Sequence, residues 1–261
     1  MARSSLKNVC RLIEGVQKDT PVERSFLLDL ERSIELDDMN SSRIPSKTYK
    51  PSSMKCLRNM WYQVTGAERD CEPSNYTSIG ICNSGTDTHE RIQSYVSNMK
   101  NNNIDCEYVD VAEYVNKNKL DYIDVVSKNG METKLFHKEL NMSFMCDGII
   151  KYKNHYYILE LKTESLGKWS GRKSVNPEHY NQAISYSLAL GINEVIFIYI
   201  CRDNSGMKSF KFDVTDDMKQ TLVAKIIECD DYVSRNECPP VPLDFDIHNC
   251  TYCDYKKLCN K

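Results

Sequence analysis

Three charged residues at alternate positions follow an apolar stretch in the segment GIIKYKNHYYILELKTES: Glu160, Lys162 and Glu164. A further carboxylate, Asp147, stands directly before this segment. Carboxylates are the hard oxygen ligands that Mg²⁺ and Mn²⁺ prefer, and a lysine beside them can orient a water molecule or stabilise developing negative charge. Taken alone, Glu160 and Lys162 also fit a strand end whose alternate side chains enter solvent. The elements around them must decide between a solvated strand and a metal site.

A predicted β-hairpin brings these groups together. Strand-forming β-branched and aromatic residues fill 142–152 and 156–161, with a tight turn at 153–154. This turn places Asp147 roughly opposite Glu160 across the hairpin. Lys162 is two residues beyond Glu160, so both side chains project from the same face of their strand. The pattern predicts two carboxylates and one ammonium group converging at a sheet edge.

The remaining pattern predicts an α/β chain. Proline and serine signals, helical spacing of apolar residues and a continuous apolar run locate the other elements. We expect helices at 51–62, from 85 to about 99, at 177–190 and at 216–236, and a buried strand at 194–200. Gly191, directly after the third helix, is a typical helix terminator. This order predicts a mixed central sheet flanked by helices.

Composition limits the classes of protein to consider. The chain has 261 residues, is 41% hydrophobic and 27% charged, and carries a net charge of −3, as is ordinary for a globular protein. No apolar run is long enough to span a membrane, and the N-terminal segment lacks the pattern of a secretory signal, so we expect a cytoplasmic protein. The negative charge argues against passive coating of nucleic acid, so any nucleic-acid contact must use a local basic groove.

Twelve cysteines are many for a chain expected in a reducing compartment, where disulfides are rare. Cys250 and Cys253 have the C-x-x-C spacing that lets two thiolates bind one centre, and Cys259 follows six residues later. Three clustered cysteines with a distant fourth fit either a [4Fe–4S] cluster or zinc, and spacing alone leaves both open. Cys238 is a competing ligand.

Five sequence motifs, in the expected order, resemble those of the PD-(D/E)XK nuclease superfamily, and in particular its RecB-like exonuclease branch with a four-cysteine iron–sulfur cluster. They are KPSSMKCLRNMWY, GTDTHERI, CDGII with ELK, YNQAISYSLAL and CTYCDYKKLC. The resemblance runs from about residue 51 to the C-terminus. This branch includes the CRISPR-associated single-strand exonucleases and the AddB-type helicase–nuclease subunits. Two positions depart from its pattern: Phe144 replaces a usual glycine, and Gly148 replaces a residue that is often basic or polar.

The resemblance implies a role for each matched residue. His89, Asp147 and Glu160, with the backbone carbonyl of Leu161, would hold Mg²⁺ or Mn²⁺. Lys162 would position the attacking water. The other implied groups are Gln182 and Tyr186, one helical turn apart, which would orient the strand to be cut, and Cys56, Cys250, Cys253 and Cys259, which would bind the [4Fe–4S] cluster.

Two further assignments come from position along the chain. Lys168, Arg172 and Lys173 fall in a polar loop after the metal strand, where we expect phosphate contacts. Glu139 is either an extra ligand or a surface charge.

The resemblance predicts a restriction-endonuclease-like core. The expected parts are a helix-prone lead-in at 1–46, a nuclease core with an N-terminal helical part at 47–236, and a Cys-rich tail at 237–261 that completes a cluster with Cys56. The implied activity is metal-dependent cleavage of DNA, most simply exonucleolytic, at a single strand or a duplex end. A helicase, recombination or CRISPR-adaptation partner and an oligomer are compatible with it. The alternatives are a catalytically silent DNA-binding adaptor and a zinc-stabilised interaction module.

Overall fold

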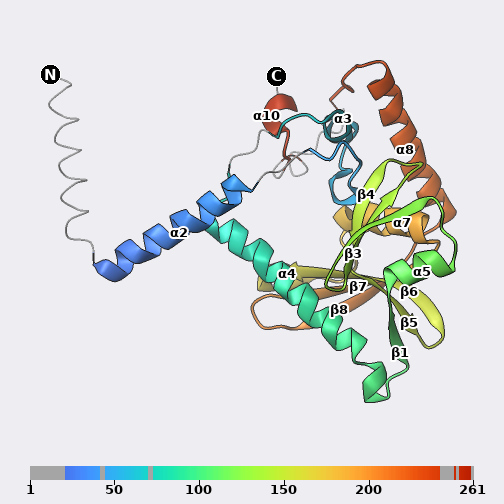
Figure 1. Ribbon diagram of the computed structural model, residues 1–261, viewed down its shortest axis with the longest axis horizontal. Helices are drawn as coiled ribbons and strands as arrows, with labels where there is room; N and C mark the ends of the chain where they lie inside the picture. Colours follow the sequence, from blue (N-terminus) through green and yellow to red (C-terminus); the bar gives the residue numbers. More distant parts are fainter. Residues whose placement is uncertain (1–20, 42–44, 70–72, 242–249, 251–252, 260–261) are drawn as a thin grey trace. The chain divides into compact units, whose positions relative to one another are not determined.

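The computed structural model describes residues 21–41, 45–69, 73–241, 250 and 253–259 (Figure 1). Contacts divide the chain into two compact units, Met1–Arg43 with Glu72–Asn83 and Ile44–Cys71 with Ser84–Lys261. In the first unit, helix α2 (Val22–Asn40) accepts a hydrogen bond at the Glu35 carboxylate from the backbone N–H of Tyr76, over 3.0 Å. No helix among the described residues is long and apolar enough to cross a membrane.

A five-stranded sheet forms the centre of the second unit, in the order β1-β5-β6-β7-β8. The strands are β1 (Cys106–Val109), β5 (Gly148–Tyr152), β6 (His155–Glu164), β7 (Glu194–Cys201) and β8 (Met207–Asp213). The β6–β7 pair is parallel and the other pairs are antiparallel. The predicted α/β fold with a mixed central sheet is therefore confirmed.

Alternate residues of the central strands supply hydrophobic clusters to the two faces of this sheet. On one face, Ile149 and Phe197 belong to a cluster with helices α3 (Leu57–Thr65), α7 (Tyr180–Leu190) and α8 (Asp216–Ser234). On the other face, Ile150 and Leu161 cluster with Ile92 of helix α4 (Tyr76–Ser97). Burial on both sides explains why β7 is an almost continuous apolar run.

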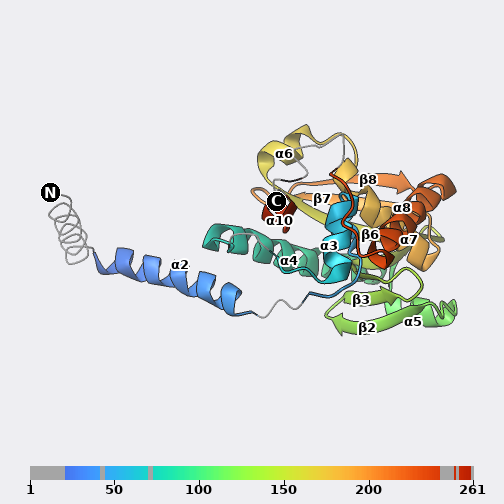
Figure 2. The same ribbon diagram turned by 90° about the horizontal axis from the view of Figure 1, so that it is seen from above.

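A second, three-stranded antiparallel sheet contains β2 (Ile123–Asn129), β3 (Glu132–His137) and β4 (Met142–Cys146). Figure 2 separates the two sheets, with β2 and β3 at one side of the view and β7 and β8 at the other. Helix α5 (Val111–Lys117) precedes β2 and is capped by Asp110, whose carboxylate accepts a hydrogen bond from the N–H of Glu113 over 3.0 Å. The ion pair of Lys128 with Asp110 ties β2 to the start of α5.

The expected single strand at 142–152 is wrong, because the chain leaves one sheet and enters the other at Asp147. β4 ends at Cys146 and pairs with β3, whereas β5 begins at Gly148 and pairs with β1 and β6. Tyr108 of β1 occupies the space over Gly148 and donates from its hydroxyl to the backbone oxygens of Asp147 and Met131, over 3.0 and 2.9 Å. The absent side chain at 148 therefore permits the crossing.

The two predicted N-terminal helix boundaries are also wrong. The expected helix at 51–62 divides into a 3₁₀ turn, η1 (Pro51–Ser53), and α3, where the Cys56 thiol rather than a serine accepts the capping N–H of Asn59. α4 begins at Tyr76 and passes through Gly85, which was the expected start. A Cβ at Gly85 would lie 3.4 Å from Thr163 Oγ1, close to an ordinary van der Waals contact. The turn η2 (Lys100–Asn102) follows α4.

The locally encoded elements match their predictions. Residues Lys153 and Asn154 form the β5–β6 turn with positive φ angles of 48° and 67°. The turn η3 (Pro177–His179) leads into α7, which ends at Gly191 with a φ of 70°. β7 and α8 occupy the expected segments.

We predict that Gly148→Ala destabilises the protein through Tyr108. The new methyl would lie 2.6 Å from Tyr108 Cε2, and the ring cannot withdraw without losing its two hydrogen bonds. Overpacking of this kind costs about 1–3 kcal/mol, which urea denaturation would measure. In a Tyr108→Ala background the same substitution should cost much less, because the obstacle is gone. Equal costs in both backgrounds would contradict this explanation.

Candidate metal centre and cysteine cluster

Asp147 is held in place where the chain passes between the two sheets. The pairing of Gly148 with Leu159 puts Asp147 next to Glu160, as predicted from the turn. The backbone N–H of Leu161 donates to Asp147 Oδ2 over 2.7 Å, and Gln93 Nε2 of α4 donates to its backbone oxygen over 2.7 Å. These contacts fix the carboxylate and leave Oδ1 directed toward other partners.

His89 and Glu132 meet Asp147 at its Oδ1. His89 Nδ1 lies 3.2 Å from Asp147 Oδ1 and 3.9 Å from Glu132 Oε1. One ligand atom from each of the three residues lies within 4.8 Å of the other two. His89 comes from α4 and Glu132 from the first position of β3, so three separate elements supply this group. The carboxylate oxygens suit Mn²⁺ or Mg²⁺, and the imidazole nitrogen favours a transition metal such as Mn²⁺ over Mg²⁺.

Glu160 and Lys162 form a buried pair beside this group. Lys162 Nζ donates to Glu160 Oε1 over 2.5 Å, and Glu160 is only 2% exposed. The other oxygen, Glu160 Oε2, is enclosed and has no hydrogen-bond partner among the described residues. Enclosing an unpartnered carboxylate oxygen is costly. A cation bound at this oxygen would satisfy it, so the residues present fit a divalent metal ion.

Burial and neighbouring charges shift the pKa values of Glu160 and Lys162. Burial raises the pKa of Glu160 to about 7, with Lys162 opposing the rise and Asp147 adding to it. Burial alone would lower the pKa of Lys162, but Glu160 and Asp147 outweigh it and raise this pKa above its ordinary value. Lys162 is therefore a cation at neutral pH.

Gln182 and Tyr186 of α7 lie against this pair. Gln182 Nε2 donates to the Tyr186 hydroxyl over 3.3 Å, and the Tyr186 ring stacks on Phe144 with centroids 5.2 Å apart. The pKa of Tyr186 is raised well above its usual value, first by burial and then by the charges of Glu160 and Asp147. Phe144, which replaces the glycine usual in the resembled family, thus packs the ring that faces the carboxylates.

The three predicted phosphate-binding side chains differ in their environments. Lys168 lies on a short helix, α6 (Leu166–Gly171), rather than in a loop, and both Lys168 and Lys173 are exposed. Arg172 is mostly covered: its guanidinium pairs with Glu164 through hydrogen bonds of 2.5–2.9 Å and stacks 4.4 Å from the Tyr199 ring centroid. Glu164, the last charge of the β6 series, therefore pairs with an arginine rather than entering solvent.

Two residues of the centre were missed from the sequence. Gln93 stands one helical turn after His89, so helical spacing could have found it. Glu132 joins Asp147 only through the pairing of β3 with β4, where Thr133 faces Cys146, and no local signal reports that register. Glu139, the carboxylate that was considered instead, is exposed between β3 and β4.

The four predicted cluster cysteines lie in one region of the second unit, although their thiols are not among the described groups of potential ligand atoms within 4.8 Å of one another. Asn59 Nδ2 lies 3.4 Å from Cys253 Sγ, and the Asn59 backbone N–H donates to Cys56 Sγ. Burial, followed by the Cys253, Cys56 and Cys259 thiols, raises the pKa of Cys250. Cys259 ends the helical turn α10 (Lys256–Cys259), next to Arg58. Segments 242–249 and 251–252 of this tail lie outside the described residues.

Cys238 shares a neighbour with Cys259, because both thiols act on the Arg58 guanidinium. The Cys238 thiol is exposed and lies 3.9 Å from the Tyr62 hydroxyl.

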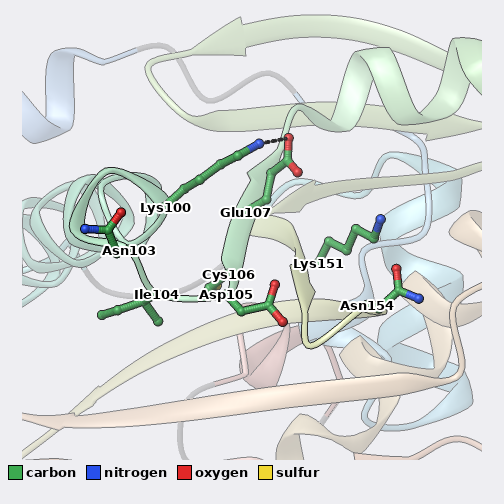
Figure 3. Close-up of a pocket in the computed structure, with 8 residues that line it drawn as sticks. All are labelled: Lys100, Asn103, Ile104, Asp105, Cys106, Glu107, Lys151 and Asn154. Carbon is green, nitrogen blue, oxygen red and sulfur yellow. Dashed lines mark ion pairs between the residues drawn. The ribbon is translucent and has the colours of Figure 1, made fainter.

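A separate pocket of about 370 Å³ lies at the far end of β1 and β5 (Figure 3). Figure 3 shows the ion pair of Lys100 with Glu107 on its wall, at an N–O distance of 3.1 Å. None of the residues of the metal centre lines this pocket. The candidate chemistry therefore lies elsewhere, at the other end of the same strands.

Comparisons with known proteins give limited likenesses. No protein-family model and no curated protein matches the chain. Similar solved structures include SSO0001, with 17% identity, coverage of 92% of this chain and 96% of that chain, and a TM-score of 0.45. An alkaline exonuclease, LHK-Exo from Laribacter hongkongensis, has 12% identity, coverage of 74% and 94%, and a TM-score of 0.40. Its complex with dAMP gives 13% identity, the same coverage and a TM-score of 0.41.

We predict that Glu132→Gln weakens Mn²⁺ binding about tenfold or more, because it removes one charged oxygen from the group around His89 and Asp147. Isothermal titration of Mn²⁺ into the purified protein would measure the change. Glu139→Gln is the matched control, since it removes an exposed carboxylate that follows the same strand. Equal affinities for the two variants would exclude Glu132 from the centre.

Proposed function

We propose that the chain is a metal-dependent nuclease that hydrolyses phosphodiester bonds of DNA, most simply from an end. One observation carries this proposal: the enclosed, unpartnered Glu160 Oε2 beside the cationic Lys162 and the His89–Glu132–Asp147 group. Such an arrangement costs free energy in the absence of a ligand. A centre that binds a cation and an anionic phosphate offsets that cost.

His89, Asp147, Glu132 and Glu160 would hold Mg²⁺ or Mn²⁺, with the carbonyl of Leu161 as a further ligand. A divalent cation in such a centre supplies Lewis-acid stabilisation of the charge that develops on phosphate oxygens. The protein contributes the fixed positions of its ligands. The hydrogen bond from Leu161 N–H to Asp147 Oδ2 sets one carboxylate relative to the strand that carries the other.

Lys162 would orient the attacking water and stabilise negative charge on the phosphate, rather than act as a base that removes a proton. Its ammonium group keeps its charge at neutral pH, because Glu160 and Asp147 raise its pKa. Held by Glu160 Oε1, Nζ has further N–H donors for an attacking water or for a phosphate oxygen. The raised pKa of Tyr186 likewise keeps its phenol neutral, and because Tyr186 is buried, it would orient the half-buried Gln182, which would donate to the bound strand.

The exposed Lys168 and Lys173 supply positive charge after β6, although the whole chain carries a net charge of −3. A local basic surface of this kind is sufficient to hold a phosphate backbone next to the centre. A single strand or a frayed duplex end is the substrate that this proposal expects, with helicase or recombination proteins as its partners.

Cys56, Cys250, Cys253 and Cys259 would bind a [4Fe–4S] cluster, with zinc as the alternative occupant. The proximity of Asn59 to both Cys56 and Cys253 supports this assignment. The cluster would fasten the C-terminal tail to the start of α3 and so stabilise the fold rather than take part in cleavage.

We predict that Lys162→Met lowers the rate of metal-dependent DNA cleavage about 100-fold to 1000-fold, because a positioned charge is lost from the reacting phosphate. End-labelled single-stranded and duplex DNA with Mn²⁺ or Mg²⁺ would provide the assay, and EDTA should abolish the activity. Lys138→Met is the matched control, since Lys138 pairs with Asp124 at the exposed opposite end of β3. Absence of cleavage by the cluster-containing wild type would favour a DNA-binding adaptor.

The cluster assignment predicts about four iron atoms and four acid-labile sulfides per chain after anaerobic purification. Cys253→Ser should lose most of both, and its melting temperature should fall because the tail is released. Cys238→Ser should retain both, since Cys238 lies outside the proposed ligand set, and their loss would make Cys238 a ligand. Stoichiometric zinc without sulfide would identify the alternative occupant.

A further inference from the structure

A histidine that is not one of the proposed metal ligands lies next to the metal centre. His179 ends η3, directly before α7, and its Nδ1 is 2.9 Å from the Tyr199 hydroxyl. The backbone N–H of Asn176 donates to the same hydroxyl oxygen over 3.0 Å. His179 and Tyr199 therefore form a hydrogen-bonded pair, and the backbone N–H of Asn176 holds the Tyr199 hydroxyl in place.

The sheet register places this pair beside Glu160 and Lys162. On the parallel strands β6 and β7, Glu160 faces Phe197 and Lys162 faces Tyr199. The His179 ring stacks over both aromatic residues of β7, at centroid distances of 6.2 Å from Phe197 and 5.8 Å from Tyr199. Adjacent strands are about 4.8 Å apart. The imidazole thus covers the strand next to the buried Glu160–Lys162 pair.

His179 also precedes Gln182 and Tyr186 by three and seven residues. This spacing puts the three side chains on one side of the chain as it enters α7. The cationic groups nearest to the imidazole are Lys162 on β6 and Arg172 after α6. Each of these cations is paired with a carboxylate of β6, Lys162 with Glu160 and Arg172 with Glu164, so His179 lies beside two ion pairs rather than beside free positive charge.

The hydrogen bonds of the Tyr199 hydroxyl determine the tautomer of His179. The Tyr199 oxygen already accepts from Asn176, and its own proton has His179 Nδ1 as its hydrogen-bond partner among the described residues. Tyr199 is fully buried, so an undonated hydroxyl proton would be costly. Burial, followed by Lys162 and Arg172, lowers the pKa of His179 to about 3, so the ring is neutral. A neutral ring that accepts at Nδ1 carries its proton on Nε2.

We propose that His179 donates a hydrogen bond from Nε2 to a non-bridging phosphate oxygen of the strand bound at the metal centre, with Tyr199 as the residue that sets its tautomer. This inference rests on the proposed nuclease function and adds a substrate-binding residue to it. His179 is half-buried, and Nε2 is not among the enclosed side-chain atoms that lack a partner. The donor is therefore not sealed inside the protein.

The test compares KM and kcat of wild type, His179→Phe, His179→Gln and Tyr199→Phe on an end-labelled single-stranded oligonucleotide with Mn²⁺. We expect His179→Phe to raise KM about tenfold with a smaller change in kcat, as for the loss of a hydrogen bond to a charged group. His179→Gln should recover most of the loss, since its amide nitrogen reaches the position of Nε2. Tyr199→Phe should show a smaller increase in KM, because the ring remains but its tautomer is no longer fixed.

His137→Phe is the matched control. His137 is also buried, packs against the Tyr122 ring at 5.0 Å and accepts at Nδ1 from the backbone N–H of Leu140, but it lies at the end of β3 opposite Glu132. The KM of His137→Phe should equal that of wild type. Thermal unfolding of every variant shows which remain folded, and Tyr199→Phe, with its smaller expected increase in KM, carries the test where His179→Phe does not fold.

The outcomes separate the two claims. Absence of cleavage by wild type would overturn the proposed function itself. Cleavage by wild type with an unchanged KM in folded His179→Phe, or in Tyr199→Phe where His179→Phe does not fold, would leave His179 a packing residue and overturn this inference. The ratio of wild-type to variant kcat/KM should stay constant from pH 6 to 9, because a neutral donor does not titrate there. A ratio that falls as the pH rises would indicate an imidazolium contact and contradict the assigned tautomer.

Discussion

The hydrogen bond from the Leu161 backbone N–H to Asp147 Oδ2 is the contact on which the candidate centre depends. It joins the point where the chain changes sheets to the strand that carries Glu160 and Lys162. The open side of Asp147 then meets His89 from α4 and Glu132 from β3. Gly148 has no side chain, and the Tyr108 ring occupies the space that a side chain would need. A change at any of these positions would move a ligand relative to the others.

Buried charge is distributed along β6 in a regular way. Glu160 pairs with Lys162, and Glu164 pairs with Arg172, both on the face that packs against α7. Arg172 comes from the segment after α6 and also donates to the backbone oxygen of Ser174, whereas Glu160 and Lys162 both lie on β6 and bond to each other. Only Glu160 retains an enclosed oxygen without a hydrogen-bond partner among these four residues. That difference separates a pair that stabilises structure from a pair that is prepared for a ligand.

Local signals explain what could be predicted from the sequence. The turn at Lys153 and Asn154, the end of α7 at Gly191 and the apolar run of β7 depend on residues close together in the chain. The turn was sufficient to place Asp147 opposite Glu160. The sheet change at Asp147 and the contribution of Glu132 depend on pairing between distant strands, which no local pattern reports. Gly85 resembled a helix start, but it lies inside α4, which begins nine residues earlier at Tyr76.

The measurement that tests the central claim most directly is anomalous diffraction from crystals of the protein soaked in Mn²⁺. The account predicts a manganese peak in contact with His89 and Asp147, with Glu160 or Glu132 completing the protein ligands. It also predicts loss of that peak in crystals of Asp147→Asn. A protein that is saturated with Mn²⁺ at other positions, with no peak beside Asp147, would contradict the account.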